Sequence, residues 1–184
     1  APAQTQGDVT VIAGQAWPAK VSSQRDKLIE RIRKDGFAHT MEAVAYTWFN
    51  RFAALRYMEL HDYLGHGHRA LSSASGGLPD ILTHATDLIN ELPGLNAAKV
   101  TELKLAGNRD GELYRMLLVA QCNALSRAMP FLFERIDDYT ELLMPDDLLS
   151  GNSILAYTRE AMTPDACSDV EVIGWLYQFY ISEK

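Results

Sequence analysis

The chain has 184 residues, of which 47% are hydrophobic and 22% are charged, and its formal net charge is −7 at pH 7. This balance is that of an ordinary globular domain, and the negative charge argues against a dedicated nucleic-acid-binding protein. No apolar run approaches the roughly 20 residues that a membrane span needs, and the N-terminus lacks the features of a signal peptide. Cys122 and Cys167 stand in no metal or redox spacing, as expected of reduced thiols. We therefore expect a soluble, cytoplasmic protein without a membrane partner.

Hydrophobic periodicity predicts an all-α fold, an irregular multi-helix bundle with one short strand at residues 8–13 and no partner strand for it. Residues 1–20 are expected to form a flexible or extended segment, and residues 21–184 a helical domain. We interpret the chain as a truncated fragment of a larger enzyme, because it lacks an initiator methionine and its last aromatic residues lie close to its end.

Two helices are expected in the first third of the chain. The first begins at Ser22 or Ser23, runs to Lys34 and stops at Gly36. The second spans residues 41–64 and has two neighbouring apolar stripes, which leave a narrow polar edge. A helix that is apolar over most of its circumference lies in the middle of a bundle.

Shorter helices are expected in the rest of the chain. The last of them carries four aromatic side chains, which we expect to divide between the core and an exposed apolar patch. These are Trp175, Tyr177, Phe179 and Tyr180. The expected helices span 79–91, 96–106, 110–127, a stretch that begins at Asn152 or Ser153, and 164–181.

A cluster of potential metal ligands follows the central helix. His61, Asp62, His66 and His68 fall within eight residues. Zinc requires three or four converging ligands, and no distant Cys/His pair completes a recognisable site. Histidines at the C-terminal end of a helix are also favoured by its dipole. We therefore expect no metal at this cluster.

The letters of a metal-dependent nuclease occur in the middle of the chain. Asp80 follows a proline, and Glu102 and Lys104 have the Glu-x-Lys spacing. That chemistry needs carboxylates on adjacent strands to hold Mg²⁺. The residues around Glu102 lack strand composition, so we interpret the match as chance.

Arg56 and Glu59 are charged residues inside the apolar arc of the central helix. Their i, i+3 spacing allows them to pair with each other. We interpret them as a structural ion pair within the bundle, rather than as a contact to DNA or substrate.

Basic residues gather near the N-terminus despite the negative net charge. Residues 20–56 contain eight basic and four acidic residues. Such a face can contact a phosphate backbone, although ordinary solvated helix surfaces give the same pattern. The candidate DNA contacts are Arg31, Arg33 and Lys34 near the end of the first helix and Arg51 on the polar edge of the second.

The motifs of a catalytic domain are absent from the sequence. It has no Pro-Pro pair, no Gly-x-Gly turn after a predicted strand, no phosphate-binding loop and no nucleophile elbow. We therefore expect neither catalytic residues nor a cofactor site in this chain.

Four parts of the chain have a distinctive sequence, most of them in the order of their aromatic residues, and they are 45–51 continuing into 55–61, 102–108, 122–125 continuing into 128–134, and 171–184. Together these stretches resemble the N-terminal region of the PglX family, the adenine-specific DNA methyltransferases of bacterial BREX phage-exclusion systems. The resemblance covers nearly all of residues 20–184.

The resemblance implies that the parent enzyme methylates adenine N6 with S-adenosylmethionine, while this segment contributes no catalytic residue. It implies as partners the downstream methyltransferase domain, double-stranded DNA and other phage-defence proteins. The segment itself would serve packing, DNA contact or docking. Two alternatives stay open, a free-standing helical interaction module and a divergent metal-dependent nuclease domain.

Overall fold

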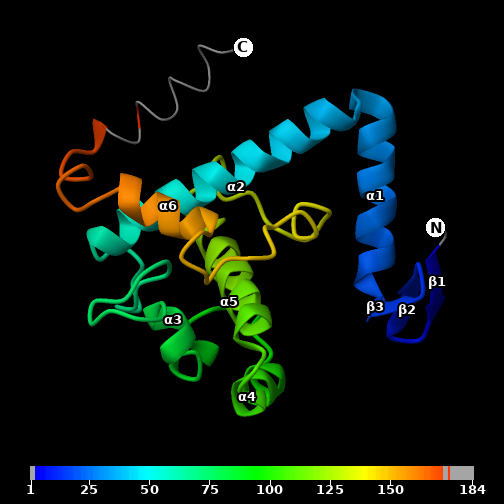
Figure 1. Cartoon of the computed structure of the whole chain (residues 1–184), viewed down its shortest axis with the longest axis horizontal. Coiled ribbons are helices and arrows are strands. Elements are labelled where there is room, and N and C mark those ends of the chain that lie inside the picture. The colour runs from blue at the N-terminus through cyan, green and yellow to red at the C-terminus, as the bar shows by residue number, and fades with distance from the viewer. Residues whose placement is uncertain (1–2, 172–173, 175–184) are drawn as a thin grey trace. The chain divides into compact units, whose positions relative to one another are not determined.

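A computed structural model describes residues 3–171 and Gly174, and it divides into two compact units. The first unit contains the chain up to Trp48 together with Ile136–Met144. The second contains Phe49–Arg135 and the chain from Pro145 onward. Helices predominate in the described residues, as the sequence predicts, and a small sheet accompanies them (Figure 1). No helix in the described part is long and apolar enough to cross a membrane.

The N-terminal residues form an antiparallel sheet of three short strands in the order β1-β2-β3. The expected strand is present as β2, but the expectation that it has no partner is wrong. Gly7 and Gly14 have φ angles of +59° and +81° in the two connecting turns. Glycine adopts such angles readily, so the chain can reverse within two residues. The strands are β1 (Ala3–Gln6), β2 (Val9–Ile12) and β3 (Gln15–Pro18).

Two long helices follow the sheet, α1 (Lys20–Asp35) and α2 (Phe37–Leu60). Gly36 separates them with a φ of +85°, and its N–H bonds the carbonyl of Ile32 at 2.9 Å. The expected stop at this glycine is confirmed. α2 ends at Leu60, earlier than expected, and the following residues form turns.

The first unit has a small core at the start of α2. Val44, Trp48, Ile136 and Met144 are buried there. The indole Nε1 of Trp48 donates a hydrogen bond of 2.9 Å to the carbonyl of Thr140. This bond attaches the 136–144 segment to α2.

The second unit is built around α5, whose inward face is fully buried. The single helix expected at 79–91 is divided into a short α-helix and a 3₁₀ turn. The predicted starts at Asn96 and Ser153 are confirmed, because their side chains accept N–H bonds from Lys99 and Ala156. The elements are α3 (Asp80–Thr83), η1 (Asp87–Ile89), α4 (Ala97–Ala106), α5 (Asp110–Leu125) and α6 (Ile154–Ala161).

The end of the chain differs from the prediction where it is described. Residues 164–170 form turns and bends instead of the first helical turns. Thr163 nevertheless accepts the N–H of Ala166 through its hydroxyl at 3.2 Å, as a cap would. The four aromatic residues expected in this helix lie outside the described residues.

Candidate functional site

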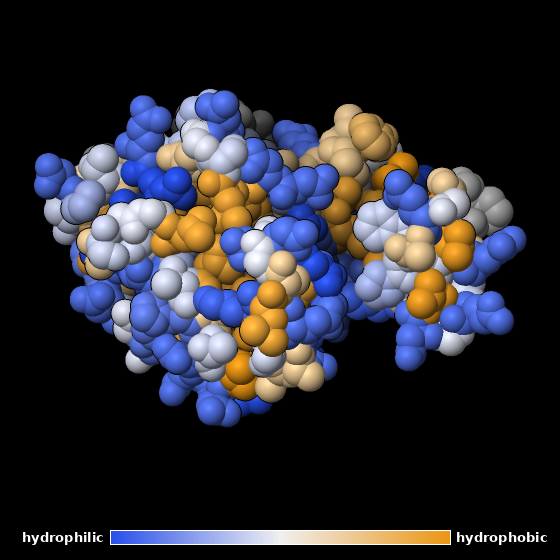
Figure 2. All heavy atoms as spheres, turned by 60° about the horizontal axis from the view of Figure 1, so that its bottom comes forward, coloured by the Kyte–Doolittle hydropathy of each residue, from blue (hydrophilic) through white to orange (hydrophobic). Residues whose placement is uncertain are grey.

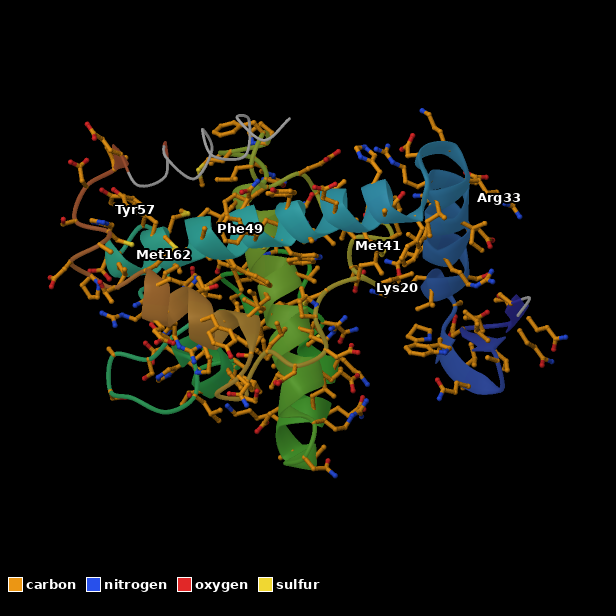
Figure 3. The ribbon with its side chains drawn as sticks, turned by 45° about the horizontal axis from the view of Figure 1, so that its top comes forward. Lys20, Arg33, Met41, Phe49, Tyr57 and Met162 are labelled. Carbon is orange, nitrogen blue, oxygen red and sulfur yellow. The ribbon has the colours of Figure 1, made fainter. Side chains whose placement is uncertain are left out.

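Three of the four candidate DNA contacts lie on the last turns of α1. Arg31, Arg33 and Lys34 are all exposed. Arg31 pairs through Nε with Asp35 at 2.5 Å. Arg33 extends away from the helix (Figure 3), and the cations of the last turn face the negative end of the helix dipole. These side chains are accessible to a phosphate backbone.

Arg51 is not on an exposed edge of α2, contrary to the sequence analysis. Its relative exposure is 2%, and its Nη2 donates a 2.7 Å hydrogen bond to the carbonyl of Glu134. The periodicity of α2 alone does not reveal this burial, because the segment after α5 covers the edge. A buried guanidinium cannot reach a phosphate, so Arg51 is withdrawn as a DNA contact.

Arg56 and Glu59 form the structural ion pair that their spacing predicts. Arg56 Nη1 lies 2.5 Å from Glu59 Oε1, and both side chains are buried. Arg56 Nε also donates to the carbonyl of Met162 at 2.9 Å. Glu59 accepts the N–H of Leu71 at 2.6 Å and the hydroxyl of Ser72 at 2.8 Å. The charges are thus compensated by partners within the unit.

Two further helices hold the same stretch of chain. The Tyr114 hydroxyl of α5 donates to the carbonyl of Ala70 at 2.9 Å. Arg159 of α6 donates through Nη1 to the carbonyl of Leu71 at 3.0 Å. Burial, and then the charge of Glu59, raises the pKa of Tyr114. The sequence did not indicate the bonds made by Tyr114 and Arg159, because the carbonyls that they bind lie 44 and 88 residues away.

Beside this network, residues 162–167 pack on the last turns of α2. Met162 and Cys167 form an apolar cluster with Ala53, and Tyr57 and Leu60 pack against it. Figure 3 shows Tyr57 and Met162 close together. Both cysteines of the chain are buried and free of disulfides. Figure 2 shows apolar residues scattered among polar ones over the face that it presents.

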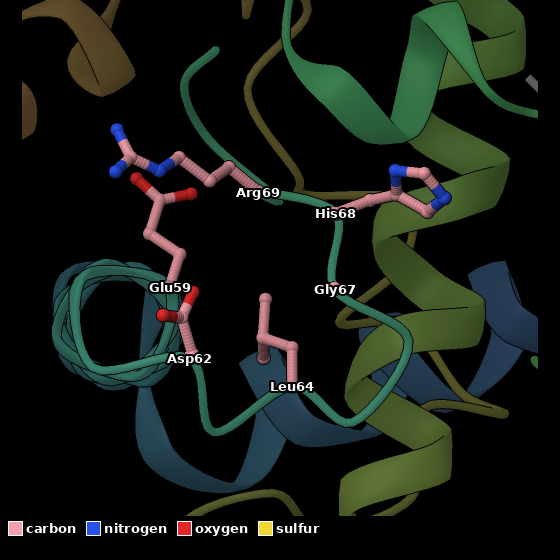
Figure 4. A pocket seen from close by; sticks show the side chains of 6 residues that line it. All are labelled: Glu59, Asp62, Leu64, Gly67, His68 and Arg69. Atoms are coloured by element: carbon pink, nitrogen blue, oxygen red, sulfur yellow. The ribbon is translucent and has the colours of Figure 1, made fainter. Parts of the chain in front are cut away.

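The histidines that cluster in the sequence have separate partners in the structure. His61 Nε2 donates to the carbonyl of Cys167 at 2.8 Å. His66 Nε2 donates to Gln121 Oε1 at 2.6 Å, and burial is the main reason that the pKa of His66 lies below its usual value. His68 points away from Glu59 across the loop (Figure 4). His66 and His68 lie side by side with ring centroids 5.9 Å apart, whereas His61 bonds a different segment.

A small hollow lies beside the same loop. Figure 4 shows it between Glu59, Asp62, Leu64, Gly67, His68 and Arg69. The space in it that a water-sized molecule can occupy is about 10 Å³, roughly what one water molecule needs.

The residues with the letters of a nuclease motif each bond other groups in the structure. Asp80 accepts the N–H groups of Arg69 and Ala74. These bonds and one from the Ser73 hydroxyl outweigh burial, the largest single influence, and hold the pKa of Asp80 below its usual value.

Glu102 and Lys104 lie on a helix, α4, rather than on strands. Glu102 pairs with Lys99 and Arg109, and Lys104 Nζ donates to the carbonyls of Leu82 and Thr83. The geometry supports the interpretation of the Glu-x-Lys spacing as a chance match.

The chain has relatives among known proteins. No family model matches the chain. Over 186 residues, covering all of the chain, it is 48% identical to the adenine-specific methyltransferase BrxX of Escherichia coli O9:H4 (strain HS). Over 177 residues, covering 87% of the chain, it is 33% identical to the adenine-specific methyltransferase PglX of Lacticaseibacillus casei (strain Zhang).

The resemblance found in the sequence is confirmed. The chain is similar to a segment of adenine-specific methyltransferases, and each match spans 15% of the length of the relative.

Proposed function

We propose that this chain is the N-terminal helical segment of a larger adenine-specific DNA methyltransferase of a BREX phage-exclusion system. The observation that supports the proposal is the 48% identity across the whole chain to a methyltransferase of which it covers 15%. The longer enzyme would transfer a methyl group from S-adenosylmethionine to adenine N6. The segment itself is non-catalytic, in keeping with the absence of cofactor motifs from its sequence.

Within that enzyme, we propose that the last turn of α1 contacts the DNA backbone. Arg33 and Lys34 are exposed, and among the residues that the structure describes neither of them forms an ion pair. Arg31 is exposed too, but its pairing with Asp35 makes it the weaker contact. Contacts of this kind add affinity without reading sequence.

The test is a charge reversal in the longer methyltransferase. Arg33→Glu combined with Lys34→Glu should weaken binding to double-stranded DNA of any sequence. The slope of log affinity against log salt should fall by about 0.9 for each phosphate that the variant no longer binds. Arg127→Glu combined with Arg135→Glu is the matched control, because it makes the same change in net charge at two exposed residues of the second unit.

Two results separate the parts of the proposal. Equal DNA affinity and salt slope in both variants would overturn the DNA contact and favour a scaffold or docking role. A gene whose reading frame carries no methyltransferase motifs after this segment would overturn the enzyme itself and favour a free-standing interaction module. Arg56→Glu should lower the melting temperature instead of DNA affinity, because its charge is buried beside Glu59.

A further inference from the structure

Two imidazoles and a carboxylate meet at the surface of the second unit, next to the loop after α2. The rings of His68 and His84 stack with centroids 4.4 Å apart and planes 16° from parallel. His84 Nδ1 lies 3.2 Å from Asp87 Oδ2. One potential ligand atom from each of the three residues lies within 4.8 Å of the other two. The sequence cluster contained only His68 of this group.

The main chain fixes both sides of this group. His84 follows α3, its N–H bonds the carbonyl of Asp80, and the N–H of Asp87 bonds the carbonyl of His84. The main chain next to His68 is bonded to α3, because the N–H of Ile81 donates to the carbonyl of Arg69 at 3.1 Å. The backbone positions of the three residues are thus set by the fold.

The side chains are free to adjust on this fixed backbone. The side chain of His84 is 47% exposed and that of Asp87 is 62% exposed. Neither has to leave a packed core to rotate. His68 is half-buried and its N–H donates to His66 Nδ1 at 3.2 Å. Since His66 Nε2 is already bonded to Gln121, both ring nitrogens of His66 are engaged.

We propose that His68, His84 and Asp87 form a binding site for a divalent transition-metal ion of the zinc type, with water completing the coordination. Bonds of about 2.0–2.2 Å in a tetrahedral site place ligand atoms about 3.3 Å apart. His84 and Asp87 already have this separation, and His68, within 4.8 Å of both, has to approach by at most about 1.5 Å. Imidazole nitrogen selects zinc, nickel, cobalt or copper over magnesium and calcium.

Binding has a structural consequence, because the nitrogen lone pairs of the two stacked rings lie in nearly parallel planes. Lone pairs that converge on one ion require at least one ring to turn out of the stack. The more exposed ring, that of His84, is the one that turns with the least loss of packing. The ring signals of His68 and His84 should therefore shift together when metal binds.

Calorimetric titration of the untagged 184-residue chain with zinc chloride tests the proposal. We expect one equivalent to bind, nickel to compete, and magnesium to give no heat. His84→Ala and Asp87→Ala should each lower zinc affinity by about tenfold or more, since the loss of outer-shell partners alone costs 10–100-fold. Both side chains are exposed, so circular dichroism should show that the variants remain folded.

His39→Ala is the matched control, because His39 is an exposed histidine on α2 in the first unit. It should leave zinc affinity unchanged. The proposal is overturned if the wild-type chain binds less than one equivalent. It is equally overturned if His84→Ala and Asp87→Ala bind as tightly as wild type, or if His39→Ala weakens binding as much as they do.

Discussion

Glu59 and Glu141 perform comparable tasks in the two units, since each joins a helix to a segment elsewhere in its unit. Glu59 is buried and binds Arg56 together with the main chain at Leu71. Glu141 is partly exposed and accepts bonds from Lys20 at 2.7 Å and Gln24 at 2.8 Å. A charge buried with complete partners is costly to disturb, whereas a solvated pair contributes little. We therefore expect the loss of Glu59 to destabilise its unit more than the loss of Glu141 destabilises the other.

The largest effect is expected from Glu59→Gln. The substitution leaves the buried Arg56 cation without its counter-charge, which should reduce the free energy of unfolding by about 3–5 kcal/mol. Urea denaturation followed by circular dichroism measures the loss. Arg56→Met combined with Glu59→Gln should recover part of it, because it removes the unpaired cation while an amide oxygen at position 59 can still accept the N–H of Leu71. A loss of unfolding free energy below about 1 kcal/mol for Glu59→Gln would show that the charge of Glu59 is not needed to balance that of Arg56.

A second effect is expected at alkaline pH, and it arises in the second unit. Burial raises the pKa of Cys122 to about 12 and also raises that of Tyr114. Above about pH 9 the unfolded chain releases thiol protons that the folded chain retains, so stability should fall from there up to about pH 12. Below pH 9 the Cys122 thiol is protonated in both states and makes no pH-dependent contribution.

Thermal unfolding between pH 8 and pH 11 measures this dependence. Cys122→Ala should make the fall with pH shallower, whatever the substitution costs at pH 8. An identical slope in the variant and the wild type would show that Cys122 ionises normally in the folded state.

The smallest effect is expected from Glu141→Gln in the first unit. Its charged partner, Lys20, is exposed, so the loss should be about 0–1 kcal/mol and should shrink as salt is added. Urea denaturation at low and high salt gives both quantities. If Glu141→Gln lowered the free energy of unfolding as much as Glu59→Gln, the two carboxylates would contribute equally to stability and the expected difference would be wrong.

Helix ends were predicted correctly where they depend on one residue and its near neighbours in the sequence. Gly36 ends α1, and Asn96 and Ser153 begin α4 and α6 as expected. The pairing of Arg56 with Glu59 was also accessible, because both residues lie on one helix face. In each case the two residues that interact are three or four positions apart in the sequence.

Features that depend on distant segments were missed. The burial of Arg51 depends on a carbonyl 83 residues away. The sequences of β1 and β3 do not alternate clearly between apolar and polar residues, so neither strand was predicted. Gly7 and Gly14 lie in the two-residue turns that connect the strands. His68 and His84 come together through α3, and proximity in sequence could not indicate it.

The stretch from Ala70 to Ser72 is bonded by side chains of α2, α5 and α6, and most of these bonds are made to its main chain. If one of these helices separates, the main-chain group that it binds loses its partner, while the other two helices still hold the stretch in place. The free energy of a local opening there consequently approaches that of global unfolding. The amide hydrogen of Leu71 should accordingly be among the slowest in the chain to exchange with solvent.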